Sequence, residues 1–356
     1  MKDKIILVNR SYLPEVGGIQ QNLSKISYFL KRDYIVDILT SPIDGRSKYE
    51  NMDGVNVFRK SPLLFFVYDY SPYDVVVLNN FTISPLFFAC LKLMYLKKLT
   101  SFKGRIIFVP HGGFTPDWKD FDFISSLIKR SYHRIFGRFF INNFVDKIIA
   151  VSEWERIALV QERIIKNISI IKGGIEKVGL ENEQKENYFV FVGRIDPIKN
   201  IEEIIETFSY IRQNVNFQKY ALRIVGDYKN NPVYFDRLSR LTEKRGLRDC
   251  VEFLGQIEGI AKLQIIAKAQ CLFCLSHMES DSLVIKEALS VKTKVFINTN
   301  YGLKDYESEN NVFVKYMDNF GINDFSKFIA KPFNNVLKIP LDTWEQVATK
   351  YKRVWF

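Results

Sequence analysis

One stretch of the sequence decides the fold of the second half: Ala269-Gln270-Cys271-Leu272-Phe273-Cys274-Leu275-Ser276-His277-Met278-Glu279-Ser280-Asp281-Ser282-Leu283-Val284-Ile285-Lys286-Glu287-Ala288-Leu289. It begins with an apolar run of strand length, continues as a short polar loop and ends with the pattern of a helix. Ser282 is expected to cap that helix and to leave the amides of Leu283 and Val284 pointing out of its start, where they attract phosphate. Glu279 and Glu287 place a carboxylate on either side of this position. The combination suits a nucleotide sugar, but an ordinary strand-to-helix connection with two solvated acids explains the segment equally well.

The same alternation of strand and helix runs through the first half of the chain. Val75-Val76-Val77-Leu78 is apolar at four successive positions, which is typical of a parallel strand buried on both faces. The pattern also predicts helices at 20–30 and 86–96. Strands are expected at 5–9, 34–40, 55–59, 75–79, 105–110, 147–152 and 169–171. Together these elements predict a doubly wound parallel sheet.

A break in composition divides the chain. Residues 177–187 are polar and acidic without periodicity, so we predict a linker there between a first domain, 1–176, and a second, 188–340. After the break the pattern restarts, with strands at 188–192, 220–226, 251–255 and 295–298 and helices at 201–212, 234–245 and 259–267. The sequence therefore predicts an α/β protein with two Rossmann-like domains whose strands point their carboxyl ends at a central cleft, where such sheets bind ligands.

The C-terminal tail, 341–356, has a helical pattern of its own. Trp344, Val347 and Tyr351 fall on one stripe, which Val354 or Trp355 continues. We expect this helix to return to the first domain.

Composition narrows the classes of partner. The chain has 356 residues, enough for two domains with separate cores, and its net charge of +11 favours a polyanion, an anionic membrane or a phosphorylated ligand. Between Lys92 and Arg138, ten Lys or Arg stand against three Asp or Glu, so much of the excess is local. No basic–aromatic RNA motif accompanies this charge, and we expect no nucleic-acid partner.

The same survey predicts a cytoplasmic protein. The strand-like run at 5–8 follows the start of the chain directly, so no signal peptide is expected, and Lys92 interrupts the apolar stretch at 86–96. The four cysteines do not resemble a disulfide framework. We interpret the pair Cys271 and Cys274, a CxxC inside an apolar run, as buried thiols in preference to a zinc or redox site.

Several loops at predicted strand ends carry groups suited to a phosphorylated ligand. Gly17-Gly18 precedes the first helix, where paired glycines permit close backbone approach and positive φ. Arg194 and Lys199 follow the first strand of the second domain and suit a pyrophosphate, since cations at a helix start oppose the helix dipole unless an anion is bound. His111 ends an apolar strand and precedes two glycines.

The ordered set of these motifs resembles the retaining glycosyltransferases of family 4, with the GT-B architecture, of the type that builds bacterial cell-surface polysaccharide. The resemblance covers nearly the whole chain, and Glu279 and Glu287 have the E-x7-E spacing of that family. The matching segments are Pro14-Glu15-Val16-Gly17-Gly18-Ile19, Val109-Pro110-His111-Gly112, Ile171-Lys172-Gly173-Gly174-Ile175-Glu176, Val192-Gly193-Arg194-Ile195-Asp196-Pro197-Ile198-Lys199-Asn200, Ile224-Val225-Gly226-Asp227, Val251-Glu252-Phe253-Leu254-Gly255 and the opening stretch.

The resemblance implies roles for the residues named above. Arg194 and Lys199 would hold the donor diphosphate and stabilise it as the leaving group, Glu287 would accept hydrogen bonds from the ribose, and Glu279 from the transferred sugar beside His111. The implied catalytic residues are His111, Arg194, Lys199 and Glu279. The implied donor-binding residues are Gly17, Gly18, Gly193, Arg194, Lys199, Gly226, Gln256, Ile257, Glu279, Ser282, Leu283, Val284 and Glu287.

Two departures from the family pattern bear on the substrate. Many members follow the first Glu with an apolar residue and a Gly or Pro, whereas here Asp281 is expected to bring an extra carboxylate towards the sugar or phosphate. The usual Asn-Gly before the linker is Gly173-Gly174.

The expected activity is transfer of a hexose-type sugar from a UDP- or GDP-sugar to a glycan or polyprenyl-diphosphate-linked acceptor. The scheme requires no metal or other cofactor, and Asp120-Phe121-Asp122, a DxD, lacks the preceding apolar strand that would support a metal role. No carboxylate is placed for a double displacement, which favours substitution on the same face of the sugar. The alternative is a GT-B-like isomerase or hydrolase of nucleotide sugars.

A basic helical segment, 127–140, is the candidate surface for a membrane. Leu127, Ile128, Tyr132, Ile135 and Phe139 recur at helical spacing, with Lys129, Arg130, Arg134 and Arg138 between them. Such a helix suits the anionic inner face of a plasma membrane and a lipid-linked acceptor. A helix that turns its apolar side to the core and its basic side to water fits the same pattern.

Overall fold

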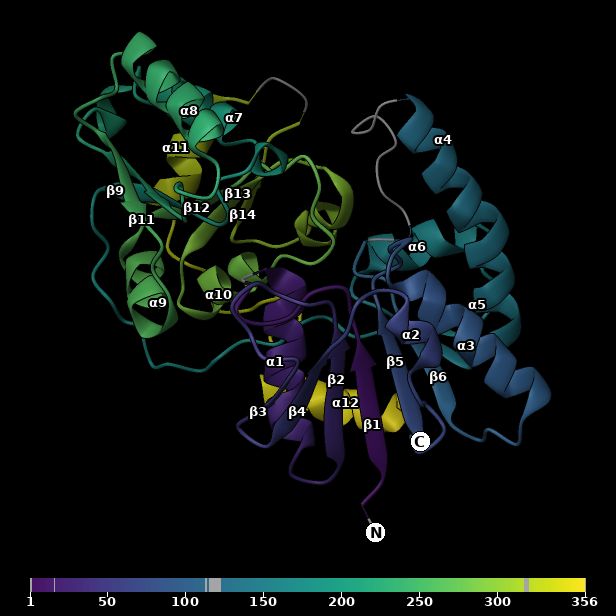
Figure 1. Ribbon diagram of the computed structural model, residues 1–356. Helices are drawn as coiled ribbons and strands as arrows, with labels where there is room; N and C mark the ends of the chain where they lie inside the picture. The colour runs from purple at the N-terminus through teal and green to yellow at the C-terminus, as the bar shows by residue number, and fades with distance from the viewer. Residues whose placement is uncertain (1, 16, 113, 115–122, 317–319, 356) are drawn as a thin grey trace. The chain divides into compact units, whose positions relative to one another are not determined.

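The chain forms two compact units. The computed structural model describes residues 2–15, 17–112, 114, 123–316 and 320–355 (Figure 1). The first unit comprises Met1–Gly174 with Trp344–Phe356, and the second Ile175–Thr343. In the described part of the chain, no helix combines the length and the apolar composition needed to cross a bilayer.

The first unit is built on an eight-stranded sheet with the order β3-β4-β2-β1-β5-β6-β7-β8. All neighbours are parallel except β3 and β4. The strands are β1 (Lys4–Val8), β2 (Ile35–Thr40), β3 (Tyr49–Met52), β4 (Val55–Arg59), β5 (Val75–Asn79), β6 (Arg105–Val109), β7 (Lys147–Ala150) and β8 (Ile168–Ile170). The strand order reverses between β1 and β5, so the loops after these two strands flank the switch point of the sheet.

Helices cover both faces of this sheet because its strands are apolar on both sides. Ile6, Val8, Val76 and Leu78 belong to one core cluster with buried residues of α3 and α5, while α12 packs on α1. The helices are α1 (Gly18–Leu30), α2 (Leu64–Val67), α3 (Leu86–Leu99), α4 (Phe123–Ser131), α5 (Arg138–Phe144), α6 (Glu153–Gln161) and α12 (Trp344–Trp355).

A π-helical turn, η2 (Tyr132–Gly137), joins α4 to α5. Gly137 lies in it, where a Cβ would press on the rings of Phe81 and Phe114. The wider turn changes the helical phase. Five residues were predicted to form the apolar side of 127–140. Among them, Tyr132 stacks on Phe81 with a centroid distance of 5.1 Å. The other four are exposed: Leu127, Ile128, Ile135 and Phe139. The alternative of a core-facing apolar side is therefore wrong for these four.

The second unit has a six-stranded parallel sheet with the order β11-β10-β9-β12-β13-β14, which reverses between β9 and β12. Its strands are β9 (Tyr188–Val192), β10 (Ala221–Val225), β11 (Val251–Gly255), β12 (Cys271–Cys274), β13 (Lys294–Ile297) and β14 (Val312–Val314). Its helices are η3 (Pro197–Lys199), α7 (Ile201–Ile211), η4 (Val215–Phe217), α8 (Pro232–Lys244), α9 (Gly259–Lys268), α10 (Leu283–Ser290), η5 (Tyr301–Tyr306) and α11 (Ile322–Ala330).

The central strand β9 contributes to two cores. Phe189 and Phe191 pack with α7 and α8 on one face, and Tyr188 and Val190 pack with α9 and α10 on the other. The predicted fold class, two doubly wound parallel sheets, is confirmed. Cys271 and Cys274 are buried free thiols, as expected of an apolar central strand.

The segment predicted as a linker, 177–187, belongs to the second unit. Leu180 is buried in its core, and the ammonium group of Lys185 donates to the carbonyl of Ala267 at 2.6 Å and to the hydroxyl of Thr293 at 2.7 Å. Burial lowers the pKa of Lys185 to about 8. A polar composition therefore does not make this segment a free linker, because the buried Leu180 and the half-buried Lys185 fix it to the second unit.

The tail helix α12 belongs to the first unit. Trp344, Val347, Tyr351 and Trp355 are buried, so Trp355 and not Val354 completes the apolar stripe. Arg32 and Glu345 form an ion pair of 2.6 Å between α12 and the end of α1.

Candidate active site

The loops that carry most of the predicted donor-binding residues leave the carboxyl ends of β9 and β12. These two strands flank the switch point of the second sheet, which is where ligands of open α/β sheets bind. The amide of His277 donates to the carbonyl of Ile198 at 2.8 Å, so the loop after β12 is tied to the loop after β9. The fold thereby brings two distant motifs together.

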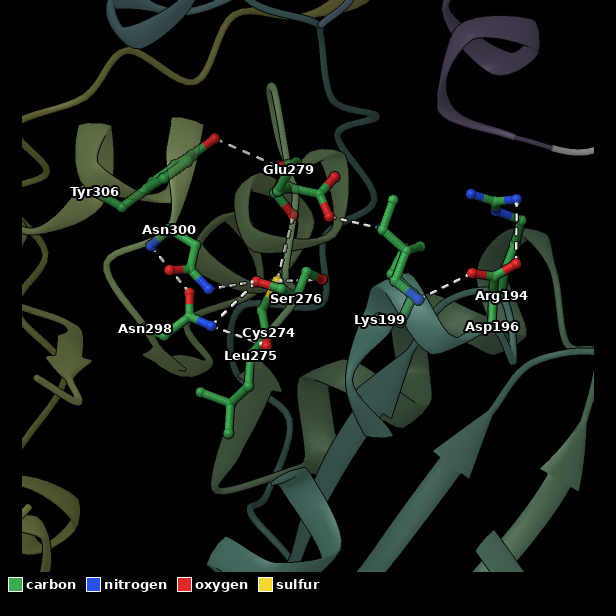
Figure 2. Close-up of polar contacts among 12 residues, drawn as sticks. Arg194, Asp196, Lys199, Cys274, Leu275, Ser276, Glu279, Asn298, Asn300 and Tyr306 are labelled. Atoms are coloured by element: carbon green, nitrogen blue, oxygen red, sulfur yellow. Dashed lines mark hydrogen bonds and ion pairs between the residues drawn. The ribbon is translucent and has the colours of Figure 1, made fainter. Parts of the chain in front are cut away.

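The loop after β9 presents two cations differently. Asp196 caps the short helix η3 by accepting from the amide of Ile198 at 3.0 Å. Arg194 lies beside that carboxylate at 4.0 Å and is 60% exposed, so its guanidinium is available to an incoming anion. Lys199 is the last residue of η3, and its largely buried side chain points towards Glu279 (Figure 2).

Lys199 and Glu279 form an ion pair across the two loops, with Nζ 2.6 Å from Oε2 (Figure 2). Burial opposes the charged form of this lysine, but the Glu279 carboxylate outweighs it and holds the pKa of Lys199 above its usual value. The lysine therefore remains a cation at neutral pH. The residues assigned by resemblance to the diphosphate and to the sugar contact each other directly.

Three asparagines fix the backbone at the end of β12. Asn200 and Asn298 donate to the carbonyl of Leu275 at 3.2 and 2.9 Å, and Asn298 and Asn300 donate to that of Ser276 at 3.1 and 3.2 Å (Figure 2). These bonds hold the loop that carries Glu279 before any ligand is bound.

The short helix η5 holds the same loop from its other side. The amide of Gly302 donates to the carbonyl of Glu279 at 2.8 Å, and a Cβ on Gly302 would overlap the carbonyl oxygen of Ser280. Only glycine permits this approach of backbone to backbone.

Asp281 does not point a spare carboxylate at a ligand, and that prediction is wrong. Its carboxylate pairs with the ammonium of Lys286 at 2.5 Å, and the two side chains are 7% and 1% exposed. Tyr306 donates to the other carboxylate oxygen at 3.2 Å. The pair is a buried structural connection between the loop and α10.

The helix α10 begins as predicted, but its cap differs. Ser282 occupies the N-cap position without a side-chain capping bond, and its buried hydroxyl lies 3.9 Å from the sulfur of Cys274. The predicted N-cap position is therefore confirmed, although the hydroxyl of Ser282 does not bond to the helix start. Leu283 and Val284 are the first two residues of the helix, whose amides have no acceptor within the helix itself.

Glu287 lies one turn further along α10 and is paired separately from Glu279. Lys262 on α9 places its Nζ 2.7 Å from Oε1 of Glu287. Near the start of α9, Gln256 is exposed and donates to Glu258 at 2.5 Å, while Ile257 packs on the core. Gln256 and Ile257 follow the carboxyl end of β11, and Glu287 lies on the helix that follows β12.

Gly193 and Gly226 meet where β9 and β10 end. A Cβ on Gly226 would overlap the carbonyl oxygen of Gly193. Packing of the two strand ends is therefore a sufficient reason for glycine at position 226, without a ligand.

In the first unit, the predicted residues follow β1 and β6. Gly17 is the N-cap of α1 with φ −164°, and a Cβ on Gly18 would meet none of the described atoms within 4 Å. The backbone of Gly17 is extended, and neither glycine uses the positive φ that glycine permits. A Cβ on Gly17 would lie 2.6 Å from the side-chain oxygen of Gln20, so of these two glycines it is Gly18 that leaves open space at the start of the thirteen-residue helix.

His111 has a left-handed backbone, with φ +50°, followed by Gly112 at +78°. Its Nε2 lies 3.3 Å from Oδ1 of Asn79 at the end of β5, the other strand at the switch point. The two turns thus direct an imidazole to the carboxyl edge of the first sheet. Asp120 and Asp122 of the DxD lie outside the described residues.

Sequence reasoning missed the partners that hold this site. Lys262 and Lys286 were overlooked because a lysine on a helix usually extends into water. Asn298 and Asn300 could have been found, since they follow the apolar run of β13 directly and polar residues at parallel strand ends point to a site.

Comparison with known proteins agrees with this geometry. Residues 175–326 match the family Glycosyl transferases group 1. An uncharacterized glycosyltransferase of Methanocaldococcus jannaschii is 22% identical, over 99% of this chain and 98% of its own.

Solved structures share the fold over nearly the whole length. Sucrose-phosphate synthase from Thermosynechococcus elongatus has a TM-score of 0.76 and 17% identity, covering 99% of this chain and 98% of its own. HepE of Anabaena, solved with UDP and glucose, has a TM-score of 0.67 and 15% identity, with coverage of 99% and 95%. The UDP-forming trehalose-phosphate synthase of Burkholderia xenovorans, solved with glucose-6-phosphate, has a TM-score of 0.67 and 12% identity, with coverage of 99% of both chains. Residues 175–326 therefore match the family Glycosyl transferases group 1, and the chain is a transferase with the GT-B fold.

Proposed function

We propose that the chain transfers a hexose-type sugar from a UDP- or GDP-sugar to a glycan or lipid-linked acceptor, with retention at the anomeric carbon. The product belongs to surface polysaccharide such as O-antigen, capsule or lipopolysaccharide. The observation that carries the proposal is the Lys199–Glu279 pair, which joins a cation and a carboxylate from two loops at a switch point. HepE, which shares the fold, has been solved with UDP-glucose and supports the choice of donor.

In the proposed reaction, the bond between the anomeric carbon and the diphosphate oxygen breaks, and the acceptor oxygen bonds to the same face of that carbon. The electron pair of the broken bond stays on the diphosphate, and the proton of the acceptor passes to a phosphate oxygen. Arg194 and Lys199 stabilise the negative charge that develops there. Because Lys199 stays protonated, it is ready for this role at neutral pH.

In the remaining proposed contacts, different residues bind different parts of the donor. Glu279 accepts hydrogen bonds from the sugar and Glu287 from the ribose, and the amides of Leu283 and Val284 contact phosphate. Gly193, Gly226, Gln256 and Ile257 border the nucleotide. On the first unit, His111 is proposed for the sugar and Gly17-Gly18 for phosphate.

The test is removal of the two cations. Arg194→Ala and Lys199→Ala should each lower turnover by roughly 10²–10³-fold, because each removes a donor that stabilises developing charge. Arg237→Ala is the matched control, since this arginine lies on α8 of the same unit and is 71% exposed. Wild-type turnover by the Arg194→Ala/Lys199→Ala double variant would refute the assignment.

The donor and the type of reaction need their own measurements. A screen of UDP- and GDP-sugars by thermal unfolding should identify the donor, because a ligand at 100 times its Kd adds about 2.7 kcal/mol of stability. Analysis of the product anomer distinguishes retaining transfer from hydrolysis or isomerisation. Turnover should persist in excess chelator if no metal is needed.

We also propose that the first unit contacts an anionic membrane through residues 127–140. The support is the exposure of Leu127, Ile128, Ile135 and Phe139 beside Arg130 and Arg134. In Figure 1, α5 lies beside α3, and α3 packs on both α5 and α2. The short helix α2 and the residue before it add four exposed apolar side chains, Leu63, Leu64, Phe66 and Val67. Apolar side chains among cations suit the surface of a charged bilayer.

Vesicle sedimentation at low salt tests the membrane contact. The protein should bind vesicles of phosphatidylglycerol and not of phosphatidylcholine, and Ile135→Ser should weaken binding because Ile135 is 72% exposed. Val233→Ser, at an 80% exposed position on the second unit, is the control. Failure to bind phosphatidylglycerol, or a stable dimer that buries this surface, would contradict the proposal.

A further inference from the structure

A fully buried carboxylate, that of Glu155, lies beside the turn that carries His111. It comes from the first turn of α6 and accepts hydrogen bonds from two neighbouring strand ends. Its Oε2 accepts from the amide of Val151 after β7 at 2.8 Å, and its Oε1 accepts from the amide of Gly112 after β6. One side chain thus connects the loops after two adjacent strands.

Glu155 belongs to the N-terminal capping sequence of α6. Ser152 caps the helix by accepting from the amide of Glu155 at 3.1 Å, which makes residues 152–155 a capping-box sequence. In a capping box the glutamate returns to the amide of its own N-cap residue. Here one oxygen of Glu155 accepts from the amide of Gly112 at the end of another strand, so the glutamate of this helix start also serves a different loop.

The contact bears directly on His111. The amide of Gly112 belongs to the peptide that joins it to His111, and the two residues have successive φ values of +50° and +78°. A residue other than glycine keeps a left-handed backbone only where its surroundings enforce it. The bond from Gly112 to the buried carboxylate is such a constraint, and it fixes the direction in which the imidazole leaves the chain.

We propose that Glu155 is a positioning residue, which holds the peptide between His111 and Gly112 and thereby sets the imidazole for sugar transfer. This inference rests on the proposed function. A carboxylate offers an acceptor oxygen to each amide, whereas the amide group of glutamine offers only one and turns its NH2 towards the other N–H. Glu155→Gln should therefore release the turn, and a displacement of about 1 Å is expected to cost on the order of 10²-fold in kcat.

The experiment combines kinetics with NMR of the imidazoles in the full chain. The protein has only three histidines, so each gives a separate ring signal. Glu155→Gln should shift the signal of His111 and lower kcat, while the signal of His277, on the second unit, stays unchanged. In a His111→Ala background, the same substitution should cause no further loss of kcat, because the effect passes through the imidazole. Glu309→Gln is the matched control, since Glu309 is a buried carboxylate of the second unit that accepts from a backbone amide, that of Ile339.

Glu155→Asp keeps the charge and shortens the side chain, and provides a second variant if the first fails to fold. An unchanged His111 signal in a folded variant would overturn the proposal, and so would an additive loss in the His111→Ala background. Failure of both variants to fold would also overturn it, because Glu155 would then be structural. If no donor is turned over by the wild type, the proposed function fails, but the NMR comparison still decides the positioning role.

Discussion

At the carboxyl edge of the second sheet, three lysines pair with three carboxylates, whereas the same edge of the first sheet is formed by glycines, an imidazole and a buried glutamate. The pairs of the second unit are Lys199–Glu279, Lys262–Glu287 and Lys286–Asp281. In the first unit, Glu155 accepts from backbone amides, and Gly18 leaves space at a helix start.

The difference teaches how each edge can recognise a ligand. The Lys199–Glu279 and Lys262–Glu287 pairs place cations and carboxylates where the proposed donor would need them, whereas the buried Lys286–Asp281 pair holds the loop in place. At the first edge, backbone turns and small residues determine the shape of the surface. This edge therefore suits recognition of a ligand by its shape and orientation. Four predictions test this contrast, from the largest effect to the smallest.

Breaking the buried pair of the second unit should have the largest effect on stability. Lys286→Met should lower the free energy of unfolding of this unit by about 3–5 kcal/mol, because the Asp281 carboxylate loses its ammonium partner in a buried position. All four tryptophans lie in the first unit, so hydrogen exchange of α10 is the suitable measurement. Lys327→Met, which removes an exposed pair with Asp324, is the control and should cost less than about 1 kcal/mol. Equal effects of the two variants would show that the buried pair is not structural.

Replacing one glycine of each unit by alanine should show which glycine is needed for packing and which for ligand binding. Gly226→Ala should cost about 1–3 kcal/mol of stability, because its Cβ would overlap the carbonyl oxygen of Gly193. Gly18→Ala should keep the wild-type melting temperature, since its Cβ meets none of the described atoms, and should weaken donor binding if phosphate approaches there. A Gly18→Ala protein with unchanged donor affinity would argue against a phosphate contact at this helix start.

The pair on α9 and α10 should affect binding of the donor. Glu287→Gln should raise the donor Kd roughly tenfold, which is about 1.4 kcal/mol, because a hydrogen bond to a charged group is lost. Lys262→Met leaves the carboxylate in place and should have the smaller effect. Isothermal titration with the donor found in the screen measures both. A larger loss in Lys262→Met would mean that the ammonium, and not the carboxylate, contacts the donor.

Mildly acidic pH should have the smallest effect, a loss of stability in the first unit. Burial lowers the pKa of His133 in the first unit, so the folded state favours the neutral imidazole. Its contribution to stability is present above the unfolded pKa of about 6.5 and is lost as the pH falls through the lower folded pKa. Tryptophan fluorescence should therefore show the first unit losing stability below that pH, and less so in His133→Phe. The same slope in both proteins would assign the acid effect to other groups.

Much of the fold was predictable because buried parallel strands have a clear apolar signature. The strands at 55–59, 75–79, 188–192 and 251–255 have the predicted bounds. The strand β3 was missed because Tyr-Glu-Asn-Met has no apolar alternation and pairs antiparallel at the edge of the sheet. β14, a three-residue strand at an edge of the second sheet, was also missed.

The site was predictable in its positions but not in its pairings. The spacing of Glu279 and Glu287 and the loop with Arg194 and Lys199 are visible in the sequence, and their roles remain predictions. Which carboxylate meets which lysine depends on the packing of α9, α10 and η5. Asp281 shows the consequence, because a residue that looks exposed in a polar loop is buried against Lys286.

The π-helical turn at Tyr132–Gly137 has a consequence for the history of this protein. A helix that acquires one extra residue can keep both flanks helical by widening a single turn. Homologues are therefore expected to differ by one residue at this point, without any change in the strands on either side. Loss of that residue would rotate the preceding segment by about 100° and present other side chains outward. Such a change would alter the side chains that this surface presents while the strand ends that precede His111 and Glu155 stay the same.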